Sequence, residues 1–389
     1  MKDAKPCTPT PHDGPDLNFA SDNAGPVHPA IMAALTGANH GRALPYGADP
    51  WTSRATDAIR DLLDAPRAEV LLVPTGIAAN ALALATLTPP WGRVFCGETA
   101  HIEMDEGGAL GLASGGAETA LVAAPHGRMT PEALAARIAA EPPARRGTVS
   151  ITQVTEAGTV YALDHLAALG AVARDRGLPV HIDGARWSNA AAALGCTPAE
   201  MIRATGAAAL SFGASKAGAM GAEAVVLLGP SPDLAEAARM RRQRMGLTLS
   251  KHRYLAAQIL AWLEGGLWRD MALAANAAAA RLAKGLAALP DVALAHPTEA
   301  NMVFVRAPRA LLRGLRAAGV GFYLQDLPEP PLDDGPDDAA LTARFVCDWA
   351  TDAARVDALL ALAEELAQEH AQELAQDMAR DPAAQAPAK

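Results

Sequence analysis

The sequence has few of the features that mark secreted, membrane-spanning or metal-binding proteins. Its 389 residues include only four cysteines, which follow neither a CxxC nor a metal-ligand spacing. No stretch approaches the ~18 uninterrupted apolar residues of a membrane span. The first residues, MKDAKPCTPTPHDGPDLNF, have no apolar signal-peptide core. We therefore expect a cytoplasmic protein with reduced thiols, no metal and no membrane partner.

Positive charge is also scarce. The formal net charge of -10 argues against a nucleic-acid partner, because surfaces that bind nucleic acids are basic. Lysine occurs at only six positions: Lys2, Lys5, Lys216, Lys251, Lys284 and Lys389. Lys216 is unusual among them, because it lies in SFGASKAGAMGAEA, between small and mostly apolar residues.

Strand-like and helix-like stretches alternate through the middle of the chain. The stretches EVLLVP, LPVHID, AAALSFG and EAVVLLG read as buried strands, and TGIAANALALATL and LDHLAALGAVARDRG read as helices. This alternation predicts βαβ units and an α/β fold with a mainly parallel sheet. After a change of composition near Lys251–Trp268, the strands NMVFVRA, GVGFYL and RFVCDWA predict a smaller α+β domain.

The predicted organisation has four parts. We expect a disordered tail over 1–16, a large domain over 17–255, a small C-terminal domain over 256–365, and a helical extension and tail over 366–389. The extension is predicted from apolar residues at near-helical spacing in VDALLALAEELAQEHAQELAQDMARD.

Two residues at strand ends point to a site. Asp183 ends PVHID and Lys216 follows AALSFGAS, so parallel strands would bring both to the ligand-binding edge of the sheet. They form either a salt bridge or the two ends of a cofactor site, and the small residues around Lys216 favour the cofactor because they leave room. Pyridoxal phosphate needs a lysine of lowered pKa for a Schiff base and an acid at its ring nitrogen.

A phosphate site is predicted in VPTGIAAN, where a strand ends and a helix begins. Thr75, Gly76 and Ile77 offer backbone N–H groups at the helix N-terminus, and Thr75 adds its hydroxyl. Such a junction alone is more often a plain helix start. Here Asp183 and then Lys216 follow it along the chain, so that a phosphate site, an acid and a lysine occur in this order.

That set resembles the fold-type-I pyridoxal-phosphate enzymes, and within them the low-specificity L-threonine aldolase family. The resemblance covers roughly Leu17–Trp349 and rests on NFASDNAGPVHPAIMAAL, PYGADPWT, VPTGIAAN, CGETAHIEMDEGGA, VHIDGARWSNAAAALG and SFGASKAGAMGAEAVV. The HIDGAR segment is the most diagnostic. The resemblance implies a mainly parallel, seven-stranded-type sheet between helices and a smaller C-terminal α+β domain.

The resemblance also implies roles for individual residues. Lys216 would bind pyridoxal 5'-phosphate covalently, Asp183 would pair with its ring nitrogen, and Thr75, Gly76 and Ile77 would hold its phosphate. His101 would stack on the ring and take part in proton transfer. Arg186, Ser21 and Arg344 would bind the substrate carboxylate, although Arg186 alone could pair with a structural acid. Tyr46 would reach a neighbouring subunit's cofactor in a homodimer or homotetramer, although it could simply shape a turn.

The implied reaction is the retro-aldol cleavage of L-threonine, L-allo-threonine or bulkier L-β-hydroxy-α-amino acids to glycine and an aldehyde. The alternatives are a β-eliminating lyase or an aminotransferase for a small amino acid, and a non-catalytic cofactor-binding protein. Many family members have a second histidine near the substrate hydroxyl, but AAEPPARRGTVSITQ contains none. The base for the hydroxyl therefore stays open between His101 and a bound water. The lysine segment, GASKAGAMGAEA, also departs from the form that many family members have, which marks this chain as a divergent branch.

Overall fold

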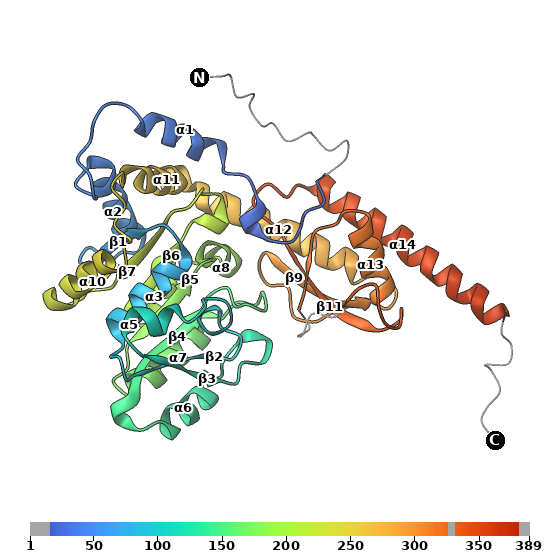
Figure 1. Cartoon of the computed structure of the whole chain (residues 1–389), viewed down its shortest axis with the longest axis horizontal. Helices are drawn as coiled ribbons and strands as arrows, with labels where there is room; N and C mark the ends of the chain where they lie inside the picture. Colours follow the sequence, from blue (N-terminus) through green and yellow to red (C-terminus); the bar gives the residue numbers. More distant parts are fainter. Residues whose placement is uncertain (1–15, 326–330, 381–389) are drawn as a thin grey trace.

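The computed structural model describes residues 16–325 and 331–380, and it contains two β-sheets of different kinds (Figure 1). The larger has seven strands in the order β1-β7-β6-β5-β4-β2-β3, and the smaller has four in the order β10-β11-β9-β8. The tails predicted before residue 16 and after residue 380 lie outside the described residues.

The large sheet is parallel except for one strand. Its strands are β1 Glu69–Val73, β2 Arg93–Gly97, β3 Glu118–Val122, β4 Arg146–Thr152, β5 Val180–Gly184, β6 Ala209–Gly213 and β7 Glu223–Leu227. Only β7 runs against the others, because it pairs antiparallel with both β1 and β6. The mainly parallel sheet predicted from the sequence is thus confirmed, with β7 as the exception.

Helices cover both faces of this sheet, which explains its continuous apolar strands. Val70 and Leu72 of β1 join one core cluster, whereas Leu71 and Val73 join another on the opposite face. Helices α3 and α10 cover the face of Leu71, and α2, α6, α7, α8, α9 and α11 cover the other. The helices are α1 Pro29–Ala38, α2 Pro50–Leu62, α3 Gly76–Leu87, α4 His101–Met104, α5 Ala109–Ser114, α6 Pro131–Ala140, α7 Leu163–Arg174, α8 Trp187–Leu194, α9 Pro198–Thr205, α10 Pro232–Arg244 and α11 Arg253–Leu263.

The smaller sheet is antiparallel and packs with three helices around its own core. Its elements are α12 Leu267–Leu286, β8 Ala293–Leu294, β9 Met302–Pro308, α13 Arg309–Ala317, β10 Tyr323–Leu324, β11 Ala340–Val346 and α14 Ala353–Arg380. The predicted strand GVGFYL is reduced to the two residues of β10, and α14 runs unbroken through the predicted boundary at 365. Within the described ranges, no helix is both long and apolar enough to cross a membrane.

The start of the described chain is tied to the smaller sheet. Asn18 forms a bridge with Gly321, and the Phe19 carbonyl accepts a hydrogen bond from the Val346 N–H at 2.7 Å. Phe19 is buried in the smaller core, although the predicted large domain starts at residue 17. The chain then forms a short 3-10 helix, η1 (Asp22–Ala24), which brings Asp22 to the edge of the large sheet. The division into residue ranges stays a prediction.

Candidate active site

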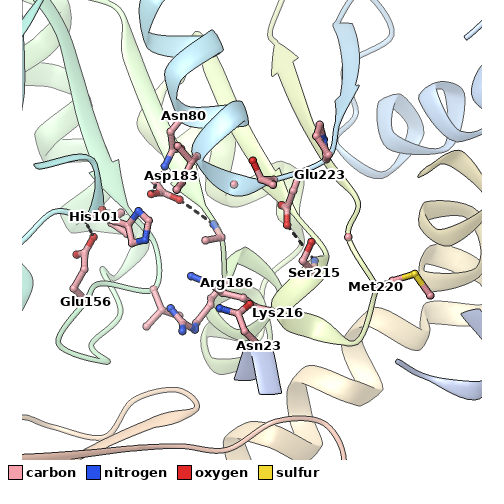
Figure 2. A pocket seen from close by; sticks show the side chains of 18 residues that line it. Asn23, Asn80, His101, Glu156, Asp183, Arg186, Ser215, Lys216, Met220 and Glu223 are labelled. Carbon is pink, nitrogen blue, oxygen red and sulfur yellow. Dashed lines mark hydrogen bonds between the residues drawn. The ribbon is translucent and has the colours of Figure 1, made fainter. Parts of the chain in front are cut away.

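A cavity of about 350 Å³ lies where β4, β5 and β6 end and α3 begins (Figure 2). Its wall contains seven residues predicted from the sequence, namely Thr75, Gly76, Ile77, His101, Asp183, Arg186 and Lys216. The carboxyl ends of the parallel strands therefore gather the residues that the strand-end argument placed together.

Asp183 is buried at the end of β5 and is held by two donors. Its Oδ2 accepts from Asn80 Nδ2 at 2.8 Å, and its Oδ1 accepts from the Ala185 N–H at 3.0 Å. These contacts fix the carboxylate in the cavity wall, where it fits the protonated ring nitrogen of pyridoxal phosphate.

Lys216 lies in the 3-10 helix η4 (Ser215–Ala217), directly after β6. The positive charge of Arg186 lowers the pKa of Lys216, and burial lowers it further. The sequence predicts desolvation as the cause of this lowered pKa, but the charge of the nearby Arg186 guanidinium contributes more. A lowered pKa increases the fraction of neutral amine, which is the nucleophilic form.

The N-terminus of α3 fits a phosphate group. Thr75 caps the helix, because its Oγ1 accepts from the Ala78 N–H at 3.2 Å. Gly76 and Ile77 come next, and N–H groups in a first turn have no acceptor within the helix. A Cβ built on Gly76 would meet nothing within 4 Å, so there is open space beside these donors. Asp183 and this helix end thus match the two ends of pyridoxal phosphate.

The small residues around Lys216 have a different purpose from the one predicted. Ala214, Ala217 and Ala219 are buried in the main core. Gly218 has a φ of +93°, and a Cβ there would lie 2.1 Å from Met271 Cε. These residues are small because protein packs against them, so the prediction that they leave room for the cofactor is wrong for them.

A hydrogen-bonded chain that the sequence did not reveal links His101 to Asp183. His101 Nδ1 lies 2.8 Å from Glu106 Oε1, and this hydrogen bond raises the pKa of His101. The same Glu106 oxygen accepts from Asn80 Nδ2 at 2.8 Å, and Asn80 also donates to Asp183. One signal was available, since Asn80 is a lone amide in an apolar helix, one turn after Gly76.

Two further carboxylic acids line the cavity, and neither was predicted. Burial raises the pKa of both Glu156 and Glu223 to about 7. Glu156 Oε1 accepts from the backbone N–H of His101 at 2.7 Å, and Glu223 Oε1 accepts from the backbone N–H of Ser215 at 3.2 Å. Figure 2 shows Glu156 beside His101 and Glu223 beside Ser215.

Arg186 is engaged by an acid of the N-terminal segment. Its Nε donates to Asp22 Oδ2 at 2.6 Å, and its Nη2 donates to Asp22 Oδ1 at 3.0 Å. Asn301 Nδ2 donates to Asp22 as well, at 3.1 Å. Burial works to raise the pKa of Asp22, but the charge and hydrogen bonds of Arg186 outweigh it and hold that pKa below its ordinary value.

Comparison with known proteins agrees with this site. The family model for beta-eliminating lyases matches residues 18–308. The low specificity L-threonine aldolase of Pseudomonas aeruginosa is 40% identical over 346 residues, which cover 88% of this chain and 95% of that protein. This chain belongs to the low-specificity L-threonine aldolase family of beta-eliminating lyases.

Other threonine aldolases give the same assignment and fold. The low specificity L-threonine aldolase of Pseudomonas sp. (strain NCIMB 10558) is 40% identical over 347 residues, which cover 88% of this chain and 96% of that protein. The solved structure of Leishmania major threonine aldolase has a TM-score of 0.81 at 24% identity and covers 90% of this chain and 99% of that chain. The family and the fold predicted from HIDGAR and its companion motifs are therefore confirmed.

Three residues predicted from the threonine aldolase resemblance do not line the cavity. Ser21 caps η1, because its Oγ accepts from the Asn23 N–H at 3.2 Å. Arg344 Nη2 donates to the Ala20 carbonyl at 3.2 Å, and Tyr46 is 61% exposed. Burial lowers the pKa of Arg344, and the positive charge of Arg186 lowers it further, so the two guanidinium groups are still close to each other. Their predicted roles stay predictions.

Proposed function

We propose that this threonine aldolase family member cleaves L-threonine, L-allo-threonine or other L-β-hydroxy-α-amino acids, phenylserine-like ones included, to glycine and an aldehyde. Pyridoxal 5'-phosphate is the proposed cofactor. The observation that carries the proposal is one cavity bounded by Asp183, Lys216 and the first turn of α3. This arrangement offers a nucleophilic amine, an acid for a ring nitrogen and donors for a phosphate.

Pyridoxal phosphate, when bound, accepts the electron pair of a bond broken at Cα. Lys216 would hold it covalently through Nζ. Asp183 would keep a proton on the ring nitrogen, and its two donors would keep the carboxylate in place. The N–H groups of Gly76 and Ile77, with Thr75, would bind the phosphate, and His101 would cover the ring.

The substrate carboxylate would be bound at Arg186. Asp22 accepts from its Nε and Nη2, and Nη1 would bind the substrate. Ser21 and Arg344 would complete the carboxylate site. Holding the carboxylate fixes which bond at Cα is placed for cleavage, so this clamp would select the aldol reaction over other reactions at Cα.

A homodimer or homotetramer with sites between subunits belongs to the same proposal. Tyr46 would then reach the neighbouring subunit's cavity, and its 61% exposure supports this role. Ile77 and Met220, which line the cavity, are 40% and 58% exposed and would be covered by the partner. We also propose a cytoplasmic location, supported by the free thiols of Cys96, Cys196 and Cys347.

The test is a product assay with a panel of β-hydroxy amino acids, with and without added pyridoxal phosphate. The proposal expects glycine and an aldehyde in equal amounts, dependent on the cofactor. The family's name makes β-elimination the second candidate. Ammonia and a keto acid without glycine would favour β-elimination, and amino transfer to an added keto acid would favour an aminotransferase.

A further inference from the structure

The cavity wall contains two acids, Glu156 and Glu223, that have no part in the function proposed above. They lie at different ends of the cavity (Figure 2). Glu223 is the first residue of β7 and accepts from the Ser215 N–H, next to the lysine. Glu156 follows β4 and accepts from the His101 N–H at 2.7 Å, on the side where His101 would cover the cofactor ring.

Glu106 occupies one of the two ring nitrogens of His101. The carboxylate of Glu106 can only accept, so the ring N–H at Nδ1 donates to it. The same hydrogen bond raises the pKa of His101. The neutral ring then offers a lone pair at Nε2 alone, on the group that is expected to lie against the cofactor ring. Glu156, which accepts from the backbone N–H of His101, places a second proton acceptor in the same part of the cavity wall.

We infer that Glu156 is the catalytic base that takes the proton of the substrate β-hydroxyl group. The inference rests on the proposed aldol cleavage and names the group that starts it. Glu156 is a cavity-lining carboxylate whose position is fixed by the backbone of His101. The hydroxyl lies on Cβ, beyond the carbon that is bound next to the ring, and the ring would lie against His101.

The step balances without any further reactant. The O–H bond of the substrate breaks, its proton goes to the Glu156 carboxylate, and its electron pair becomes the second bond of the aldehyde carbonyl. The Cα–Cβ bond breaks and its electron pair stays with Cα. Cα later gains one proton, Glu156 returns its proton to solvent, and glycine leaves. Nothing is oxidised or reduced overall.

The surroundings of Glu156 determine the pH at which it can act. Burial raises the pKa of Glu156 to about 7, and the negative charge of Asp183 raises it too, while the His101 N–H opposes the rise. The Thr152 side chain also donates a hydrogen bond to Glu156. Besides burial, the charge of Glu156 in turn raises the pKa of Cys96 and of Tyr161. A base works only when deprotonated, so aldol activity will rise as the pH increases through about 7.

The test replaces the base by an amide of the same shape. In the cofactor-loaded Glu156→Gln variant, kcat for aldehyde release from L-threonine is expected to fall about 100-fold or more, with a small change in KM. The rise of activity near pH 7 should disappear. The exchange of glycine Cα hydrogen with D₂O needs no β-hydroxyl base, so it should continue. Glu156→Asp, which keeps the carboxylate, should restore part of kcat.

Two control variants make the result specific. Glu103→Gln changes an exposed carboxylate outside the cavity and should leave kcat and the pH profile unchanged. Glu223→Gln changes the other acid with a pKa of about 7, and it should keep the rise of activity near pH 7. The inference is overturned if Glu223→Gln, and not Glu156→Gln, abolishes that rise.

Two other outcomes separate the inference from the proposed function. If the wild type makes glycine and Glu156→Gln keeps its kcat within about threefold, the inference alone is wrong. The same holds if Glu156→Gln loses glycine exchange as completely as aldol cleavage, because its role is then structural. If the wild type makes no glycine from any β-hydroxy amino acid, the proposed function is wrong and the inference falls with it.

Discussion

Arg186 and Asp22 form a two-point ion pair, in which Asp22 is buried and Arg186 half-buried, with Arg186 Nε and Nη2 at 2.6 and 3.0 Å from the two Asp22 oxygens. Asp22 comes from the N-terminal segment that is attached to the smaller sheet, whereas Arg186 follows β5 of the large sheet. A two-point pair fixes the plane of the guanidinium as well as its position. The smaller sheet thereby helps to orient the residue proposed to bind the substrate carboxylate.

Asp22→Asn should weaken substrate binding, because it removes the charge and one of the two acceptors that hold Arg186. We expect KM for the amino acid to rise about 10-fold or more, with a smaller change in kcat. Steady-state kinetics would measure both. Asp64→Asn, which alters an exposed ion pair with Arg203, is the matched control and should change neither. An unchanged KM in Asp22→Asn would show that Arg186 needs no such support.

Asn80→Ala should weaken cofactor binding. The change removes the donor shared by Asp183 and Glu106 and leaves two buried carboxylates without it. The loss of one buried hydrogen-bond partner costs about 1–3 kcal/mol, so cofactor affinity should fall about 10-fold or more. Absorbance titration of apoenzyme with pyridoxal phosphate would measure it. Equal affinity in the variant and the wild type would contradict this role.

Arg186→Met should change the pH dependence of cofactor attachment at Lys216. The charge of Arg186 is the largest cause of the lowered pKa of Lys216, so its removal will raise that pKa toward the ordinary value. Less neutral amine is then present at neutral pH, and the rate profile for attachment should shift to higher pH. Stopped-flow absorbance of apoenzyme with pyridoxal phosphate gives that profile. Arg203→Met removes one partner of the exposed ion pair with Asp64 and should leave this rate profile unchanged.

Trp187→Ala should destabilise the large domain. Trp187 is fully buried directly after Arg186, and its ring centroid lies 4.9 Å from those of Phe212 and Trp268 and 5.4 Å from that of Trp262. Its truncation should lower the free energy of unfolding by about 3–5 kcal/mol. Denaturant unfolding followed by circular dichroism would measure the loss. Trp91→Ala, at a residue 64% exposed, should change it by less than about 0.5 kcal/mol.

Much of the fold and part of the site follow from local patterns. Apolar strands followed by helices predicted the sheet, and strand ends predicted where Asp183 and Lys216 would meet. The helix start at Gly76 was predicted from the same junction. The antiparallel direction of β7 was not predicted, because EAVVLLG is equally apolar in either direction and only its pairing with β1 and β6 reveals it.

The missing part of the site depends on contacts between distant segments. Asp22 meets Arg186 across 164 positions, and Asn80 meets Asp183 across 103. No periodicity or spacing encodes such contacts. Glu156 could not be predicted for a related reason, since its pKa is raised by burial and by the charge of Asp183, and both depend on the folded structure.

Lys216 and its cavity are proposed to catalyse aldol cleavage, and counting both products from L-threonine tests this most directly. Cofactor-loaded wild type and Lys216→Ala would be compared for glycine and acetaldehyde released over the same time. We expect equal amounts of both products from the wild type and neither at a comparable rate from the variant. Glycine release by Lys216→Ala at the wild-type rate, or ammonia and a keto acid in place of glycine, would contradict it.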